Sequence, residues 1–229
     1  MSDRNDTFAT ISTQIEPFNK KGVELTDAGP PSDKDRDGLI ACLKGYQAQG
    51  IDLNQYNAAA IAEAYRVSGR LAASVTIITS RDADGVPHGM VASSVISVSM
   101  DPPSMLIAVN RSAGLYPILQ RSRRFCINLL SDDQSDLLKP FSTSALREQR
   151  FQSDHWRDAW TPDSERLPWL YDASASVECA VDLVTDYGTH SLFIGRVQQV
   201  HCAPTSTAGQ TIVRPLVWLA GQQAPLALS

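Results

Sequence analysis

Short stretches of alternating apolar and polar residues dominate the chain beyond residue 70. Residues 71–77 alternate in this way, which is typical of a half-buried strand. The period of two returns over residues 125–130, 177–183 and 192–200. Residues 105–109 form a continuous apolar run of the kind found in fully buried strands. The pattern therefore predicts at least five strands between residues 71 and 200.

Tight turns separate these segments. Asp84-Gly85 predicts a hairpin turn, and a second turn is expected at Tyr187-Gly188. Residues 88–100 look like one long strand that ends at residues 101–103, because the two prolines there cannot donate ladder hydrogen bonds. A last strand is expected over residues 215–220. Many strands joined by short turns, with few helices between them, predict a mainly β fold with an antiparallel barrel.

The helical signals are fewer. Residues 54–70 are rich in alanine and predict a helix, and shorter helices are expected over residues 115–120 and 134–141. The first fifty residues are polar and rich in turn formers. We therefore expect residues 1–55 to form a polar, partly mobile N-terminal arm and residues 56–229 to form the folded domain.

Composition and charge narrow the class of protein. Hydrophobic residues make up 43% of the 229 residues, and 20 Lys and Arg stand against 25 Asp and Glu, giving a net charge of -5. Nucleic-acid binding depends on surplus positive charge, so no nucleic-acid partner is expected. The N-terminal sequence lacks the basic start and apolar run of a signal peptide. No apolar run reaches the ~18 residues that span a bilayer, so we expect a cytoplasmic protein without a membrane partner.

Metal and disulfide signals are weak. The four cysteines, Cys42, Cys126, Cys179 and Cys202, form no C-x-x-C pair, so buried reduced thiols are favoured over a disulfide or a zinc site. Residues 33–40 resemble the start of an EF-hand loop, but its twelfth position holds Lys44 instead of a bidentate glutamate. The four histidines show no metal-ligand spacing, and no metal site is expected.

Residues 88–110 place an unusual number of hydroxyl groups in strands that are otherwise apolar. A buried hydroxyl needs a hydrogen-bond partner, so serine is a poor choice for an ordinary core. Two interpretations remain open: a strand face exposed to solvent, or a ledge that binds the phosphate and ring of a ligand. The chain contains no G-x-G-x-x-G and no Walker loop, so a nucleotide-type ligand would need a different kind of cradle. The serines are Ser93, Ser94, Ser97, Ser99 and Ser104.

Two blocks of the chain resemble a known family. Residues 74–130 contain SVTIITSRDADGVPHGMVASSVISVSMDPPSMLIAVNRSAGLYPILQRSRRFCINLL, and residues 188–197 read GTHSLFIGRV. Both blocks resemble the flavin reductase-like domain, and they occur in the order that the family has. The resemblance implies an FMN-binding antiparallel split β-barrel with peripheral helices.

The resemblance also implies roles for matched residues. The segment of residues 90–94 would line the flavin ring, Ser97 would lie near its phosphate, and His190 would face the nicotinamide as the candidate catalytic residue. Arg111 would pair with a flavin phosphate, to which a guanidinium fork is suited. The full set of expected cofactor contacts is Met90, Val91, Ala92, Ser93, Ser94, Ser97, Asn110, Arg111, Ser112, Arg150 and Phe151.

By the same resemblance, the protein would be an NAD(P)H:flavin oxidoreductase that uses FMN or FAD, with NADH or NADPH as reductant. It would form a homodimer and supply reduced flavin to a partner monooxygenase. Residues 216–222, LVWLAGQ, depart from the aromatic and basic end of the family pattern. For Trp218 two interpretations stay open, stacking on a ring of a ligand and packing in the core. Two alternatives stay open: a flavin-dependent enzyme with another substrate, and a non-catalytic flavin carrier.

Overall fold

The computed structural model describes residues 71–161, 166–202, 214–219 and 222–225. The chain divides into two compact units, Met1–Leu71 and Ala72–Ser229, of which the second contains nearly all the described residues. The predicted arm of residues 1–55, the helix of residues 54–70 and the calcium-like segment of residues 33–40 lie outside the described residues.

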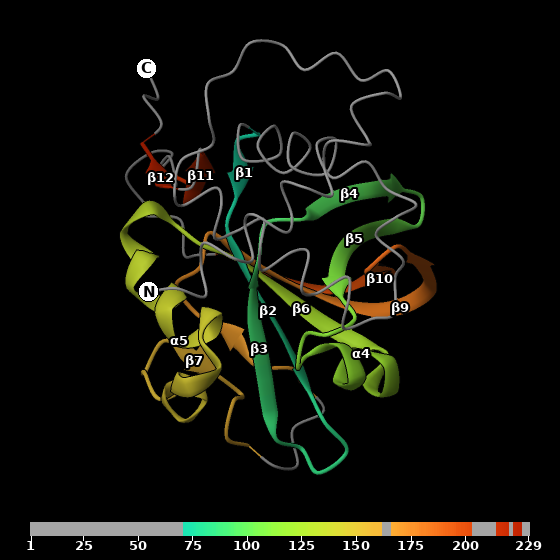
Figure 1. Cartoon of the computed structure of the whole chain (residues 1–229), viewed down its shortest axis with the longest axis horizontal. Helices are drawn as coiled ribbons and strands as arrows, with labels where there is room; N and C mark the ends of the chain where they lie inside the picture. The colour runs from blue at the N-terminus through green and yellow to red at the C-terminus, as the bar shows by residue number, and fades with distance from the viewer. Residues whose placement is uncertain (1–70, 162–165, 203–213, 220–221, 226–229) are drawn as a thin grey trace, which may run out of the picture. The chain divides into compact units, whose positions relative to one another are not determined.

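One antiparallel sheet of seven strands organises the second unit (Figure 1). Two smaller sheets accompany it, one of three strands and one of two. The prediction of a mainly β, antiparallel fold is confirmed. Across the large sheet the strands are β3 (Pro87–Ala92), β2 (Thr76–Arg81), β6 (Arg124–Leu129), β9 (Ala175–Tyr187), β10 (His190–Cys202), β5 (Pro103–Asn110) and β4 (Val95–Met100).

The remaining elements are short. The three-stranded sheet contains β1 (Ala73–Ser74), β11 (Val217–Leu219) and β12 (Gln222–Ala224), and the two-stranded sheet contains β7 (Trp156–Arg157) and β8 (Trp169–Leu170). The helices are α4 (Tyr116–Ser122), η3 (Asp132–Leu137), α5 (Leu138–Ser142) and η4 (Ser144–Gln149). Helices were therefore correctly predicted near residues 115–120 and 134–141. No helix in the described part of the chain is long and apolar enough to cross a membrane.

The prediction of a single strand over residues 88–100 is wrong. The segment forms two strands, β3 and β4, which occupy opposite edges of the large sheet. Ser93 and Ser94 join them, and the carbonyl of Ser94 accepts a hydrogen bond of 3.1 Å from the amide of Ala108 in β5. The chain thus leaves β2 and joins β5 within two residues. Alternation of apolar residues continues through this change of partner, so the sequence pattern could not show it.

Two hydrophobic clusters cover the two faces of the sheet. Ile78, Phe125 and Phe193 belong to the first cluster, and Ile77 and Trp156 belong to the second. Because adjacent residues of β2 enter different clusters, all six residues of this strand are buried. The expectation of a half-buried strand is therefore wrong for β2, which lies between the two hydrophobic clusters.

A buried asparagine fixes the second cluster to the sheet. Asn128 is 0% exposed. Its Nδ2 donates to the carbonyl of Ile77 at 2.9 Å, and its Oδ1 accepts from the amide of Leu170 and from Ser176 Oγ, each at 2.8 Å. Every strong polar group of this side chain is thereby satisfied in an apolar setting, which buried amides require.

The cysteines follow the prediction in part. Cys126 and Cys179 are buried and unpaired, and burial raises the pKa of Cys179 to about 12 and that of Cys126 well above its ordinary value. Their thiols are therefore protonated and unreactive at neutral pH. Cys202 is free but exposed, because it ends β10, so burial was wrongly expected for it. Cys42 lies outside the described residues.

Candidate functional site

The corner between β3 and β4 carries the first group of predicted contacts. Met90 and Val91 are half-buried and point to opposite faces of β3, Met90 toward the first cluster and Val91 toward the second. Ala92 is buried, and its carbonyl accepts a hydrogen bond of 2.8 Å from Thr76 Oγ1. Ser93 and Ser94 are exposed. The corner therefore presents small polar side chains to solvent above an apolar base.

Both edges of the large sheet meet at this corner. Among the described strands, β3 pairs only with β2, and β4 pairs only with β5. Edge strands carry backbone N–H and C=O groups without ladder partners. A flat ring with its own donors and acceptors can bind such an edge through backbone hydrogen bonds, which fits the heterocyclic edge of a flavin.

The serines of this region fall into two groups. Ser93, Ser94 and Ser97 are exposed, and their hydroxyl groups are open to a ligand. Ser99 Oγ donates to the carbonyl of Asp101 at 3.0 Å, and Ser104 Oγ donates to the carbonyl of Pro102 at 2.8 Å. The latter two serines therefore stabilise the turn between β4 and β5.

The end of β5 carries the second group of predicted contacts. Asn110 is opposite His190 in the β5–β10 register. The Oδ1 atom of Asn110 accepts hydrogen bonds from the amide of Ser112 at 2.9 Å and from its hydroxyl at 2.8 Å. Since Ser94 is bonded to Ala108, two residues before Asn110, the structure brings the β3–β4 corner close to this end.

Arg111 extends from this end to the turn between β9 and β10. Its Nη2 donates to the carbonyl of Gly188 at 2.5 Å, and its Nη1 lies 3.7 Å from Asp186 Oδ2. The side chain keeps 34% of its surface exposed. A guanidinium has five N–H donors, so Arg111 can hold the turn and still bind an anion.

His190 lies beside Arg111 at the start of β10. Its Nδ1 is 2.9 Å from Thr189 Oγ1. His190 is an exposed residue, but partial burial of its ring, and after it the positive charge of Arg111, lowers its pKa below the ordinary value. The imidazole is therefore neutral at pH 7, with one nitrogen able to donate and the other able to accept a hydrogen bond.

The register separates two residues that were both expected near the flavin phosphate. Ser97 is opposite Met105 in the β4–β5 pairing, six residues before Arg111. At about 3.3 Å per residue, the two positions are about 20 Å apart along the strand. Within one chain, a single phosphate therefore contacts at most one of them.

Arg150 and Phe151 have mainly structural contacts. Arg150 Nε donates to the carbonyl of Pro140 at 2.7 Å, and its Nη1 donates to the carbonyl of Gly89 at 2.9 Å, next to Met90. The Phe151 side chain packs in the second cluster, with its ring centroid 5.1 Å from that of Phe141 and 4.9 Å from that of Trp156. Phe151 is only 4% exposed, so its ring has almost no surface to offer a ligand.

Sequence reasoning missed the residues that support His190 and Arg111. Asp186 Oδ1 accepts a hydrogen bond of 2.5 Å from Ser191 Oγ, a fully buried hydroxyl, while Asp186 Oδ2 faces Arg111. Asp186 immediately precedes the predicted turn at residues 187–188, and polar side chains at such positions commonly bond to the turn. That position was the available signal.

Trp218 belongs to the three-stranded sheet and not to the large sheet that carries these groups. It is opposite Ala73 in the three-stranded sheet and is 39% exposed. It therefore does not belong to the core, which was the alternative weighed against ring stacking.

The chemistry of the assembled surface is that of a binding platform. The described residues contain no group of three or more His, Cys, Asp and Glu that could hold a metal ion. They offer hydroxyls, backbone groups, one guanidinium and one neutral imidazole. Such a set can orient a redox cofactor and its substrate, while the cofactor carries the electron chemistry.

Comparisons with known proteins agree with this assignment. A sequence model of the "Flavin reductase like domain" matches residues 68–227. The chain is 34% identical over 151 residues to "FMN reductase (NADH) RutF" of Pantoea ananatis, covering 66% of this chain and 77% of that protein. It is 33% identical over 150 residues to the reductase component of an FADH(2)-dependent resorcinol hydroxylase from a Rhizobium species, covering 65% and 78%.

A solved structure supports the same fold. The NADH:FAD oxidoreductase SgcE6 of Streptomyces globisporus, in complex with NAD and FAD fragments, superimposes with a TM-score of 0.61 at 25% identity. The match covers 72% of this chain and 92% of that one.

Proposed function

The chain belongs to the flavin reductase like domain family, and on that premise we propose that it is an NADH:flavin oxidoreductase. The bound nicotinamide supplies a hydride, which the flavin accepts. FMN and FAD both remain suitable flavins, because relatives named for each resemble the chain. NADH is the proposed reductant, because the names of the same relatives specify it.

One observation carries the proposal. The hydrogen bond between Ser94 and Ala108 brings the exposed corner of residues 93–94 next to the strand that ends at Asn110, opposite His190. Two segments that are separate in the sequence thus form one continuous surface. The segments of residues 93–94 and 110–112, which are expected to contact the flavin, lie on it together with His190, which is expected to face the nicotinamide.

The protein's own groups bind the flavin and fix its orientation. We assign the flavin ring to the backbone edge of residues 90–94, on the side of β3 that has no ladder partner among the described strands, and to the hydroxyls of this segment. Arg111 holds a flavin phosphate, and Asn110 and Ser112 shape the loop beside it. Ser97 is too distant to share that phosphate and contacts another part of the flavin. Arg150 stabilises β3 through its hydrogen bond to the carbonyl of Gly89, and Phe151 packs in the second hydrophobic cluster.

His190 orients the nicotinamide through hydrogen bonds. Thr189 Oγ1 engages Nδ1 of this imidazole, so Nε2 is the nitrogen that forms the hydrogen bond to the nicotinamide amide. Hydride transfer needs no strong acid or base on the protein, so holding two rings together and excluding water accounts for the enzyme's contribution.

We further propose that the protein works as a homodimer and passes reduced flavin to a partner monooxygenase. The support is the resemblance to the reductase component of a resorcinol hydroxylase. The exposed apolar side chains of β4, Ile96, Val98 and Met100, provide surface that a partner subunit can cover. A cytoplasmic location stays a prediction.

The decisive experiment is an anaerobic absorbance titration of the purified protein with FMN or FAD, followed by NADH and, separately, NADPH. We expect catalytic bleaching of the flavin band near ~450 nm with NADH, since the reduced cofactor loses that band. Flavin binding without bleaching would instead indicate a carrier or an enzyme with another electron donor. Absence of binding to either flavin would overturn the proposal.

A further inference from the structure

The hairpin of β9 and β10 carries an exposed tyrosine beside His190. Tyr187, the last residue of β9, lies directly opposite His190, the first residue of β10. On its other side, His190 lies directly opposite Asn110 at the end of β5. Residues that are opposite each other in adjacent strands point to the same face of the sheet, with Cβ atoms about 4.5–5.5 Å apart. The three side chains therefore form one row at the end of the large sheet.

This row lies on the face of the sheet that points away from the first hydrophobic cluster. Phe193 of β10 is 0% exposed and belongs to that cluster. Because successive residues of a strand point to opposite faces, His190 and Leu192 point away from the cluster. Leu192 is opposite Ala108, whose amide donates to the carbonyl of Ser94. The outward face thus connects the row to the corner that we assign to the flavin.

Tyr187 differs from the other tyrosines of the described residues. The ring of Tyr116 packs edge-on against Phe193, with centroids 6.1 Å apart, and the ring of Tyr171 lies 4.5 Å from the guanidinium carbon of Arg157. Tyr187 is 82% exposed, and within the described part of the chain its ring packs against no other ring or guanidinium. An aromatic ring offers a large flat apolar surface, so this one is available to stack on a ligand.

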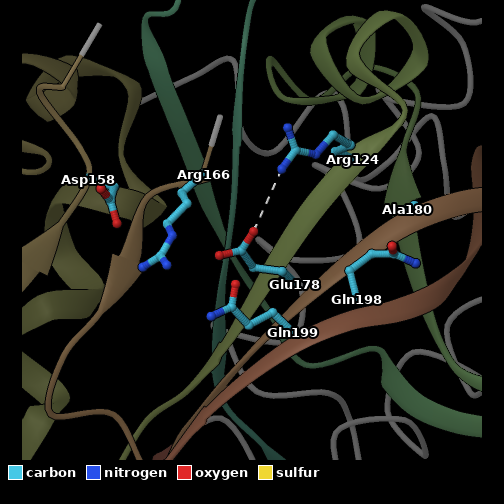
Figure 2. A pocket seen from close by; sticks show the side chains of 7 residues that line it. All are labelled: Arg124, Asp158, Arg166, Glu178, Ala180, Gln198 and Gln199. Atoms are coloured by element: carbon cyan, nitrogen blue, oxygen red, sulfur yellow. Dashed lines mark ion pairs between the residues drawn. The ribbon is translucent and has the colours of Figure 1, made fainter. Parts of the chain in front are cut away.

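The opposite end of β10 carries a polar pocket of about 790 Å³, which is the alternative place for a dinucleotide (Figure 2). Its charged side chains already pair with each other, since Glu178 Oε2 lies 3.7 Å from Arg124 Nη2. Gln198, which lines this pocket, is eight residues from His190, or about 26 Å along the strand at about 3.3 Å per residue. A nicotinamide ring in the pocket would be out of reach of His190, so the ring belongs at the end that carries Tyr187.

We propose that Tyr187 is a further substrate-binding residue, whose ring stacks on the nicotinamide ring of NADH. His190 Nε2 bonds the carboxamide, and the phenol ring covers the face of the nicotinamide that does not face the flavin. In this place the aromatic ring holds the nicotinamide against the flavin and keeps water from its outer face. This inference rests on the proposed function, because the role of His190 comes from it.

Substitution of Tyr187 tests the stacking contact. With saturating FMN, Tyr187→Ala should raise KM for NADH at least about fivefold, which is the lower end of what stacking on an aromatic side chain contributes. The kcat should change little, because the contact is made equally before and during hydride transfer. Tyr187→Phe keeps the ring and should stay within about twofold of the unaltered protein. Flavin affinity and the denaturant midpoint should be unchanged in both variants, because the side chain is exposed.

Two further ligands locate the contact. Reduced nicotinamide mononucleotide lacks the adenosine half, so its KM should rise in Tyr187→Ala by the same factor as that of NADH. A rise for NADH alone would place Tyr187 against the adenine and overturn the proposal. NAD⁺ cannot reduce the flavin, so its dissociation constant from the protein loaded with oxidised FMN is measured without turnover, by the change in flavin absorbance. It should weaken in Tyr187→Ala by a factor similar to that for NADH.

Two variants serve as controls. Tyr171→Ala makes the same substitution at a tyrosine that is 46% exposed and lies outside the large sheet, and Gln198→Ala changes the pocket in Figure 2. Both should keep the KM for NADH of the unaltered protein.

Three outcomes would overturn the inference. They are an unchanged KM for NADH in Tyr187→Ala, an equal rise in Tyr187→Phe, and a rise in Gln198→Ala instead. If NADH fails to bleach the flavin of the unaltered protein, the proposed function itself fails and this inference with it. Normal bleaching together with an unaffected Tyr187→Ala variant refutes only the role of Tyr187.

Discussion

At the scale of single residues, Arg111 and His190 act as one unit. Arg111 donates to the turn at Gly188 and faces Asp186, while its charge acts on the neighbouring imidazole. Asp186 in turn accepts from the buried Ser191. Residues of β9, of β10 and of the turn between them thus hold the Arg111 guanidinium beside His190. The effect of Arg111 on flavin binding and its effect on the imidazole can be measured separately by substitution.

Replacing Arg111 with alanine should weaken flavin binding. A charge-assisted hydrogen bond to phosphate contributes about 1.5–3 kcal/mol, so the dissociation constant should rise about 10- to 150-fold. Fluorescence titration with FMN measures it. Arg196→Ala is the control, because Arg196 forms a similar surface pair, 3.5 Å from Asp182, farther along β10. Equal affinities of the two variants would remove Arg111 from the site.

The pKa of His190 should rise when Arg111 is replaced by glutamine. Burial is the larger cause of its lowered pKa and remains, but the repulsion by the guanidinium is removed. The imidazole of the variant should therefore take up its proton at a higher pH than that of the unaltered protein. NMR titration of the His190 ring protons measures both. An unchanged or lower pKa would show that Arg111 does not act on this imidazole, and Arg196→Gln should leave it unaffected.

At the scale of elements, the long strands β9 and β10 depend on one close contact. A Cβ on Gly195 would lie 2.7 Å from Phe125 Cε1 and 2.9 Å from Cys179 Cβ, both in the first hydrophobic cluster. Neither neighbour is the free end of a flexible chain. A glycine is therefore required where β10 crosses the buried ring of Phe125.

Gly195→Ala should destabilise the fold by about 1–3 kcal/mol, the usual cost of overpacking a core. Gly114→Ala is the matched control, because a Cβ there meets only the end of the Arg147 side chain, at 3.2 Å. In denaturant unfolding, Gly195→Ala should lower the denaturant concentration at the midpoint, and Gly114→Ala should change it little. Similar midpoints for the two variants would show that β10 has room to shift.

Local patterns predicted the individual strands better than their partners. Residues 177–183 and 192–200 were correctly predicted as strands of a hairpin, because period-two alternation and the turn at residues 187–188 act over short distances. The change of partner at Ser93 and Ser94 depends on hydrogen bonds to β5, which alternation does not encode. The resemblance to the family supplied the candidate site residues, whereas the pairings of Asp186 and Glu178 required the folded sheet.

At the scale of the whole molecule, the proposed site residues and both hydrophobic clusters belong to the same unit. The unit Ala72–Ser229 contains both hydrophobic clusters, and the family match covers residues 68–227. Every proposed flavin and nicotinamide contact lies between residues 90 and 190. The predicted arm of residues 1–55 ends before the boundary between the two units, which falls at residues 71–72, and it stays a prediction.

Removal of residues 1–55 should leave a fragment that folds and reduces flavin. The physical reason is that the buried residues of both described clusters, from Val75 to Leu216, are all retained, so no core contact among them is lost. The fragment of residues 56–229 should unfold at a denaturant midpoint close to that of the full chain and oxidise NADH with FMN within about twofold of its rate, a difference of about 0.4 kcal/mol in barrier. A fragment that folds but loses activity would place part of the site in the arm, which would favour an enzyme adapted to another substrate. A fragment that fails to fold would show that the arm belongs to the core and that the two-part division is wrong.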